Sequence, residues 1–143
     1  PLCDGQGFAV GVVARMAPEG KVILCYFFGP RRDQVPTLGE VEHLSPEEVL
    51  RVLRVGDLEL IRGNWPVLGH SESWRRDEWP MPCFVRHELL TGRILRVQYS
   101  DTEPARAIRE EPVSSAADNL ESDGMYGAGA AEIILSRELA NQP

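Results

Sequence analysis

Residues 8–28, with the sequence FAVGVVARMAPEGKVILCYFF, decide the fold class of this chain. Residues 8–15 carry apolar or small side chains at both alternating sets of positions, which predicts a strand covered on both faces. Pro18 and Gly20 mark a turn, because proline presets one backbone dihedral and glycine supplies a positive φ. Residues 21–28 alternate again as a second strand. The stretch therefore predicts a β-hairpin that is central in its sheet.

A capping signal predicts a short helix after the hairpin. Ser45 suits the N-cap position, Pro46 fits the first helical position, and Glu48 completes a capping box. Gly56 ends the pattern, and the apolar side chains within residues 49–53 would cover one broad face. We therefore expect a helix between Ser45 and Gly56.

Further signals extend the sheet along the chain. We expect a strand at 57–61, an edge strand or, because of Pro66, no strand at 65–68, an irregular loop at 70–82, a hairpin of 84–88 and 93–99, a polar surface segment at 101–119 and a helix at 128–139. The apolar block at 133–135 fits a strand equally well. Together these elements predict one α+β domain over residues 1–143, with a mostly antiparallel sheet of about six strands and one or two short helices.

The composition is that of a soluble globular domain. Of the 143 residues, 43% are hydrophobic and 26% are charged, which fits one domain with a sizeable core. No apolar run approaches the ~18 residues of a membrane helix, and residues 1–8 lack the basic start of a secretory signal. Cys3, Cys25 and Cys83 are too widely spaced for a disulfide framework or a zinc signature, which favours a reducing, cytoplasmic location.

The negative charge is concentrated at the C-terminal end. The formal net charge is -7, and residues 101–143 hold nine acids against three arginines. Such a field attracts a basic protein and repels free nucleic acid. We therefore expect the carboxylates of this segment to meet a basic partner first, with a solvated, solubilising surface as the alternative. The expected contact residues are Glu110, Glu111, Asp118, Glu121 and Asp123.

All three tryptophans fall within residues 63–82. Tryptophan is enriched at interface hot spots, so Trp74 and Trp79 are candidates for an aromatic binding platform. The alternative, which we favour, is that indoles and prolines pack a long loop over an open end of the core.

The residue types that carry catalysis or bind metals do not form a motif. His43, His70 and His87 have no ligand partner at the spacing of a metal site, so we expect no metal and no cofactor. Cys83 and His87 would lie roughly 13 Å apart along a strand, too far for a nucleophile–base pair. The sequence therefore identifies no catalytic residue.

An ordered set of short motifs nevertheless resembles the bacterial immunity protein 26 family. The motifs are Asp4-Gly5, residues 7–15, residues 26–29, residues 56–58, Trp65-Pro66-Val67-Leu68-Gly69 and residues 78–82. The family is associated with polymorphic-toxin systems, in which such proteins neutralise a toxin domain, and some relatives carry a phosphotriesterase label. The resemblance implies a cytoplasmic protein and supplies no catalytic residue.

One departure from the family concerns the N-terminal side. Family members usually have another strand upstream, whose end resembles Pro1-Leu2, and here that strand is largely absent. The strand at 8–15 would then lack its hairpin partner, and its edge would pair with another chain or be covered by a loop. We therefore expect either a homodimer through this edge or a pinned N-terminus.

Two functions remain open from the sequence. The first, which we favour, is an immunity-type protein that binds a toxin domain; an acidic protein suits a basic nuclease toxin because charge complementarity speeds association. The alternative is a small phosphotriester or phosphoester hydrolase. That chemistry usually requires metal ions held by several histidines and carboxylates, and the three histidines are not clustered in the sequence.

Overall fold

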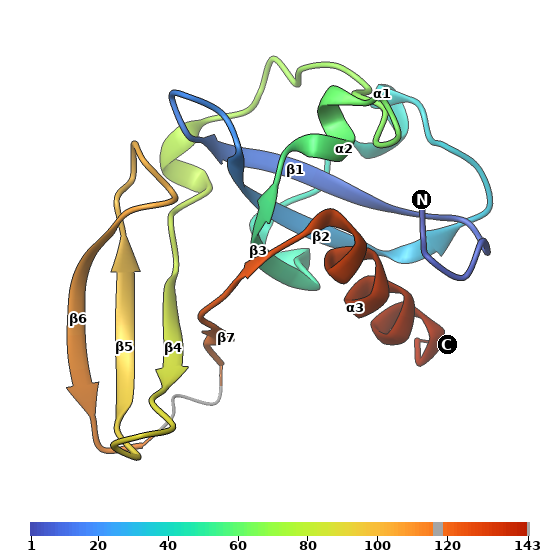
Figure 1. Ribbon diagram of the computed structural model, residues 1–143. Helices are drawn as coiled ribbons and strands as arrows, with labels where there is room; N and C mark the ends of the chain where they lie inside the picture. Colours follow the sequence, from blue (N-terminus) through green and yellow to red (C-terminus); the bar gives the residue numbers. More distant parts are fainter. Residues whose placement is uncertain (116–118, 143) are drawn as a thin grey trace.

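Two four-stranded sheets form the framework of the computed structural model, which describes residues 1–115 and 119–142 (Figure 1). The first sheet has the strand order β1-β2-β3-β8, and the second has the order β6-β5-β4-β7. Antiparallel neighbours predominate in both sheets. The α+β class with mostly antiparallel pairing is thus confirmed, with eight short or long strands among the described residues.

The predicted hairpin forms one side of the first sheet, with β1 at the edge and β2 inside. It consists of β1 (Phe8–Met16) and β2 (Val22–Arg32). Gly20 and Lys21 both have positive φ in the turn between them. Residues 22–28 are all buried, because β2 lies between β1 and β3 and both of its faces are covered. The expected central position is correct for β2 and wrong for β1, which is the edge strand of the sheet.

The helix expected after Ser45 is wrong. The hydrogen bond from the Ser45 backbone N–H to the Glu48 carboxylate is present, but it caps only the 3-10 turn η1 (Pro46–Glu48). Val49 is already extended, and β3 (Arg51–Gly56) pairs antiparallel with β2. The free edge of β2 offers backbone hydrogen bonds and a doubly buried position, which outweigh a local helix signal that lasts one turn.

Two single helical turns complete this region. The first, α1 (Leu38–Val41), lies in the connection between β2 and β3. The second, α2 (Leu58–Ile61), replaces the strand expected at 57–61, and residues 65–68 form no strand. The chain turns here because the Asp57 carboxylate accepts a hydrogen bond from the backbone N–H of Lys21 at 2.8 Å, which ends β3 at the hairpin turn.

The second sheet contains the other predicted hairpin, β4 (Cys83–His87) with β5 (Ile94–Tyr99). The loop before it contains one 3-10 turn, η2 (Arg76–Glu78). The segment expected to be polar surface is mostly exposed, but it includes a further strand, β6 (Ala107–Val113), which pairs with β5. Pro112 is tolerated because β6 is an edge strand.

The C-terminal segment joins the two sheets. β7 (Glu121–Ser122) adds in parallel to β4, and β8 (Met125–Tyr126) adds in parallel to β3. The predicted helix is present as α3 (Ala128–Ala140). No helix within the described ranges is long and apolar enough to cross a membrane.

Two apolar clusters lie on opposite faces of the first sheet. One is formed between the sheets and includes Phe28, Trp79, Phe84 and Val97. The other lies between the first sheet and α3. Figure 1 shows this arrangement, with α3 against β2 and β3 and the second sheet projecting to the other side. The second sheet is therefore the part of the molecule that extends furthest from the main core.

Candidate partner-binding surface

A buried ion pair connects β3 to the segment between β7 and β8. Arg54 is 5% exposed, and its guanidinium lies 3.5 Å from the centroid of the Tyr99 ring. It donates to Asp123 at 3.1 Å and to the Tyr99 hydroxyl at 2.7 Å, and that hydroxyl donates to the same carboxylate at 2.6 Å. Asp123 thus supplies the charge and the acceptor that a buried guanidinium requires.

Arg86 extends this network to the surface of the second sheet. It donates to Asp123 at 2.8 Å and to Glu110 at 3.0 Å. The hydrogen bond to Asp123, followed by the one to Glu110, raises the pKa of Arg86. Burial raises the pKa of Tyr99, and the hydrogen bond to Asp123 acts in the same direction. A chain of alternating charges therefore runs from Glu110 at the edge strand to Arg54 in the interior.

Arg51 makes a second connection of the same kind. Its guanidinium binds Glu121 through two hydrogen bonds of 2.6 and 2.7 Å, and it binds Glu138 of α3 at 2.9 Å. The hydrogen bond to Glu121 is the main cause that raises the pKa of Arg51. One arginine of β3 thereby holds both β7 and α3.

On the outer face of the second sheet, Glu111 is paired with Arg96 at 3.0 Å and with Arg109. Together with Cys83 and Gln98 these three side chains line an open hollow of about 140 Å³. Cys83 is only partly exposed there. The hollow thus holds two guanidinium groups, one carboxylate between them and a single thiol.

The acids predicted to meet a partner therefore differ in accessibility. Glu110 and Glu111 follow one another on the edge strand β6, and their side chains are 43% and 31% exposed. Glu121 is 20% exposed and Asp123 only 5%, so these two side chains are largely withdrawn from solvent. Asp118 lies outside the described residues. All four described carboxylates bind arginines from neighbouring strands.

A second acidic segment was not predicted from the sequence. The connection between β2 and β3 carries five exposed acids and neither lysine nor arginine over residues 33–48, which we call the acidic connection. Among the residues that the structure describes, none of these five acids forms an ion pair. Glu40 and Glu48 instead accept hydrogen bonds from Thr37 and Ser45. This acidic run is visible in the sequence, but basic residues elsewhere in the first hundred residues nearly balance its charge.

The tryptophans have packing roles. Trp79 is 5% exposed and meets the rings of Tyr26 and Phe28 edge-on, with centroids 5.1 and 6.0 Å apart. Trp74 is half-buried against the same cluster. Trp65 packs on the other face of the sheet and donates to Glu132 at 2.7 Å. The interpretation that this loop packs over the core is confirmed for Trp79.

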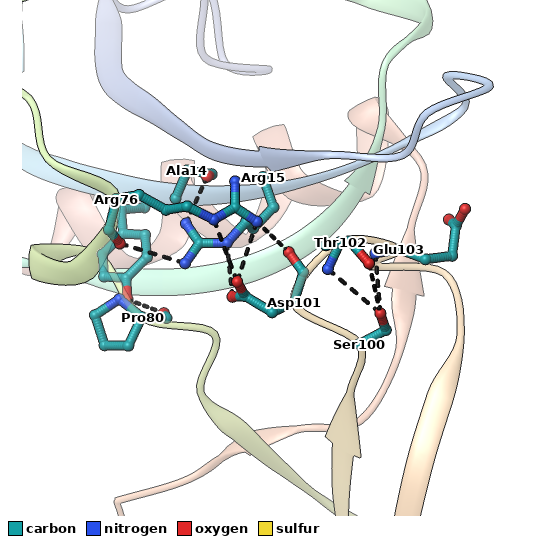
Figure 2. A network of polar contacts seen from close by, with 9 residues as sticks. Ala14, Arg15, Arg76, Pro80, Ser100, Asp101, Thr102 and Glu103 are labelled. Carbon is teal, nitrogen blue, oxygen red and sulfur yellow. Dashed lines mark hydrogen bonds and ion pairs between the residues drawn. The ribbon is translucent and has the colours of Figure 1, made fainter.

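Ion pairs and hydrogen bonds hold residues 70–82, which we call the tryptophan loop, in place (Figure 2). Arg15, which is 5% exposed, donates to Asp101 at 2.8 Å and to the Arg76 carbonyl at 3.3 Å, and Arg76 binds the same carboxylate at 3.1 Å. The Tyr26 hydroxyl donates to the Pro80 carbonyl at 2.5 Å. Partial burial acts to raise the pKa of Asp101, but the hydrogen bonds from Arg15 and Arg76 lower it below its ordinary value.

The remaining candidates for chemistry are scattered. The three histidines are exposed, and Cys83 and His87 lie at opposite ends of β4. In residues 1–115 and 119–142, no group of three or more His, Cys, Asp or Glu side chains is arranged to hold a metal ion. Cys25 is buried, and burial raises the pKa of its thiol.

Comparison with known proteins identifies the family. A family model described as Immunity protein 26 matches residues 1–96. The chain belongs to the immunity protein 26 family. This confirms the resemblance inferred from the sequence motifs. No curated protein and no solved structure was found to match.

The immunity protein 26 match covers β1 to β4 and the first half of β5. It includes the acidic connection and the tryptophan loop. The predicted contact residues Glu110, Glu111, Glu121 and Asp123 lie beyond the matched residues. The matched residues therefore include three strands of the first sheet and part of the second, and the match does not cover these four residues.

Proposed function

We propose that this chain neutralises a toxin domain by direct protein–protein contact in the cytoplasm. The observation that supports the proposal is the family match over residues 1–96. Three free cysteines suit a reducing compartment. Neutralisation by contact requires a rigid scaffold and a complementary surface. The ion-paired links from β3 and β4 to the C-terminal segment provide the first of these.

We propose that the partner is basic and that unneutralised carboxylates attract it. The acidic connection carries five exposed acids without an ion pair in the described chain, so its field extends into solvent. Glu110 and Glu111 are the accessible members of the C-terminal set, and we propose that they contact the partner directly. Glu121 and Asp123 act through the scaffold, because their carboxylates are engaged by Arg51 and Arg54.

Growth protection tests the function. The proposed function predicts a toxin gene next to the gene for this chain, and that gene is expressed from an inducible promoter in a sensitive bacterium, with and without this chain. We expect growth to be restored, and we expect the two purified proteins to form a stable complex. A chain that leaves growth arrested and forms no complex with this toxin contradicts the proposed function.

Association kinetics test the attraction. Asp33→Asn, Glu42→Gln and Glu47→Gln neutralise the acidic connection and spare the two capping acids. We expect this triple variant to associate about 10-fold more slowly at low salt, with a weaker salt dependence. The matched variant with Glu110→Gln and Glu111→Gln should mainly raise the dissociation rate. An unchanged association rate of the triple variant at low salt excludes the acidic connection as the source of attraction.

We also propose that two copies of the chain pair through β1. Within the described residues, β1 has a strand neighbour on one side only. Antiparallel pairing about Val12 would set Val13 of each copy, which is 37% exposed, opposite Gly11 of the other, where there is no side chain. Sedimentation should show a dimer that Val13→Asp converts to a monomer. A monomeric wild-type protein at micromolar concentration contradicts this pairing.

A further inference from the structure

The β4–β5 hairpin ends in two leucines that contact almost nothing. Leu89 is 97% exposed and Leu90 is 101% exposed, more than any other large apolar residue among those described. They occupy the turn between His87 and Ile94, at the end of the second sheet that lies furthest from the first sheet in Figure 1. We call residues 88–93 the leucine turn.

Hydrogen bonds fix the conformation of the leucine turn. Backbone bonds join Glu88 to Arg93 at 2.9 Å and Gly92 to Glu88 at 2.8 Å. The Glu88 carboxylate also accepts from the Thr91 hydroxyl at 2.7 Å and from Arg93 at 3.0 Å. Gly92 has a φ of 68°, which closes the turn. The two leucines are therefore presented in one arrangement before any partner binds.

The fold itself does not account for leucine at these positions. Turns favour glycine, asparagine, aspartate, serine and proline, whose backbone or side-chain chemistry suits them. Two adjacent leucines in water add an aggregation liability and contribute no core packing here. A rigidly held, fully exposed apolar pair is, however, well suited to insertion into a pocket, because little conformational entropy remains to be lost on binding.

We propose that Leu89 and Leu90 are the apolar anchor of the complex and insert into an apolar pocket of the toxin domain. This inference rests on the proposed function and adds the chemistry of the contact. The charged side chains beside the leucines, Glu88 and Arg93, neutralise each other, so the turn presents an uncharged tip. The acidic connection then supplies attraction and the leucine turn supplies the buried contact that slows dissociation.

Charge argues for a protein pocket over a lipid surface. Loops that bind anionic membranes carry unpaired lysine or arginine beside the inserted residues, each worth about 1 kcal/mol. Here Arg93 is engaged by Glu88, and the whole chain has a formal net charge of -7. Insertion into a second copy would either be reciprocal and close as a two-fold dimer or be head-to-tail and grow into larger assemblies, and sedimentation distinguishes both from a monomer.

The test compares two double variants of the full chain against the purified toxin domain encoded by the adjacent gene. The first carries Leu89→Ser and Leu90→Ser. The matched control carries Ile61→Ser and Val67→Ser, which remove apolar residues that are 73% and 71% exposed on and after α2. Calorimetry and growth protection are measured for both, together with melting temperatures and sedimentation of vesicles made of phosphatidylcholine and phosphatidylglycerol.

We expect the leucine variant to bind at least about 100-fold more weakly, with a faster dissociation rate, because two buried leucines each contribute a tenfold effect or more. The control variant should bind within about threefold of wild type. Both melting temperatures should stay within about 3 °C of wild type, since exposed positions contribute little to stability.

Four outcomes would overturn the inference. If wild type binds the toxin domain and the leucine variant binds equally well, the anchor is wrong while the proposed function stands. If wild type binds the vesicles and loses this binding with the leucines, the turn recognises lipid instead. If wild type forms assemblies that grow with concentration and the leucine variant does not, the turn contacts a second copy. A wild-type chain that does not bind the toxin domain overturns the proposed function and the anchor together.

Discussion

At the residue scale, the ion pair between Arg54 and Asp123 is buried on both sides, with side chains 6% and 5% exposed. A guanidinium removed from water is tolerated only when a carboxylate and further acceptors compensate it. Asp123 supplies that carboxylate, with Tyr99 and the Pro104 carbonyl as additional acceptors. The residue predicted as a contact for a basic partner is thus already bound to two arginines of its own chain.

Asp123→Asn should destabilise the protein strongly. The substitution preserves shape and leaves Arg54 buried without a counter-charge, which costs about 3–5 kcal/mol. Glu110→Gln, which removes an exposed partner of Arg86, should cost under about 1 kcal/mol. Urea denaturation of the two variants measures the difference. Equal losses would show that the buried pair contributes no more than a surface pair.

The two buried tyrosines should make the protein sensitive to alkali. Burial raises the pKa of Tyr26 and of Tyr99 above the ordinary value of about 10. In the folded state these hydroxyls keep their protons at a pH where the unfolded chain loses them, so stability falls as the pH rises above about 10. Absorbance titration at 295 nm of wild type, Tyr26→Phe and Tyr99→Phe should show that the Tyr26 and Tyr99 hydroxyls ionise above about pH 10, and loss of either proton at or below that pH contradicts this.

At the scale of elements, prediction succeeded where the signal is local. The alternation of residues 8–28 and the turn at Gly20 were sufficient to place β1 and β2. The helix expected at 128–139 is present as α3, although the apolar block at 133–135 fitted a strand equally well. β3 was missed because its capping signal is real but lasts one turn, while its pairing with β2 depends on a distant strand. β7 and β8 have two residues each, too few for any periodicity.

The candidate surface was predictable to a smaller extent. The arginines that neutralise Glu121 and Asp123 belong to β3 and β4, and the sequence gives no indication that these strands lie beside them. Conversely, the acidic connection was visible as a local run without basic residues. The exposure of Leu89 and Leu90 could not be predicted from the sequence, because it depends on whether another part of the chain covers the end of the hairpin.

Two glycine substitutions should distinguish the cost of a left-handed backbone conformation from the cost of fitting an added Cβ atom. At Gly92, φ is 68° and an added Cβ would meet nothing within 4 Å, so Gly92→Ala should cost about 1–2 kcal/mol through backbone conformation alone. At Gly39 of α1 there is equal space and no positive φ, so Gly39→Ala should be neutral or stabilising by up to about 1 kcal/mol. Equal effects in thermal denaturation would contradict the left-handed turn at Gly92.

At the scale of the whole molecule, residues 121–126 link parts that would otherwise be separate layers. β7 completes the second sheet, β8 completes the first, and the carboxylates of Glu121 and Asp123 bind Arg51 and Arg54 of β3. The segment therefore adds one strand to each sheet and binds both Arg51, which is half-buried, and Arg54, which is buried.

A chain that ends at residue 119 should fail to fold. It would leave Arg54 without its carboxylate and would expose Ile23, Leu53 and Val55, which are fully buried beneath α3. We expect loss of a cooperative melting transition by circular dichroism. Removal of only the residues from 141 onward, where Asn141 and Gln142 are exposed, should leave the transition intact. A cooperative transition in the shorter chain would show that the two sheets fold without the linking segment.

This link also sets the order of events during biosynthesis. Because translation proceeds toward the C-terminus, the outer edge of β4 remains open on the ribosome until residue 122 has emerged, and that of β3 until residue 126 has emerged. Neither sheet can be completed before its last strand is made, and open edges are the sites at which unfinished chains associate wrongly. For a protein proposed to protect against a toxin, protection would begin only after this stretch has been translated, and a shortened translation product would confer none.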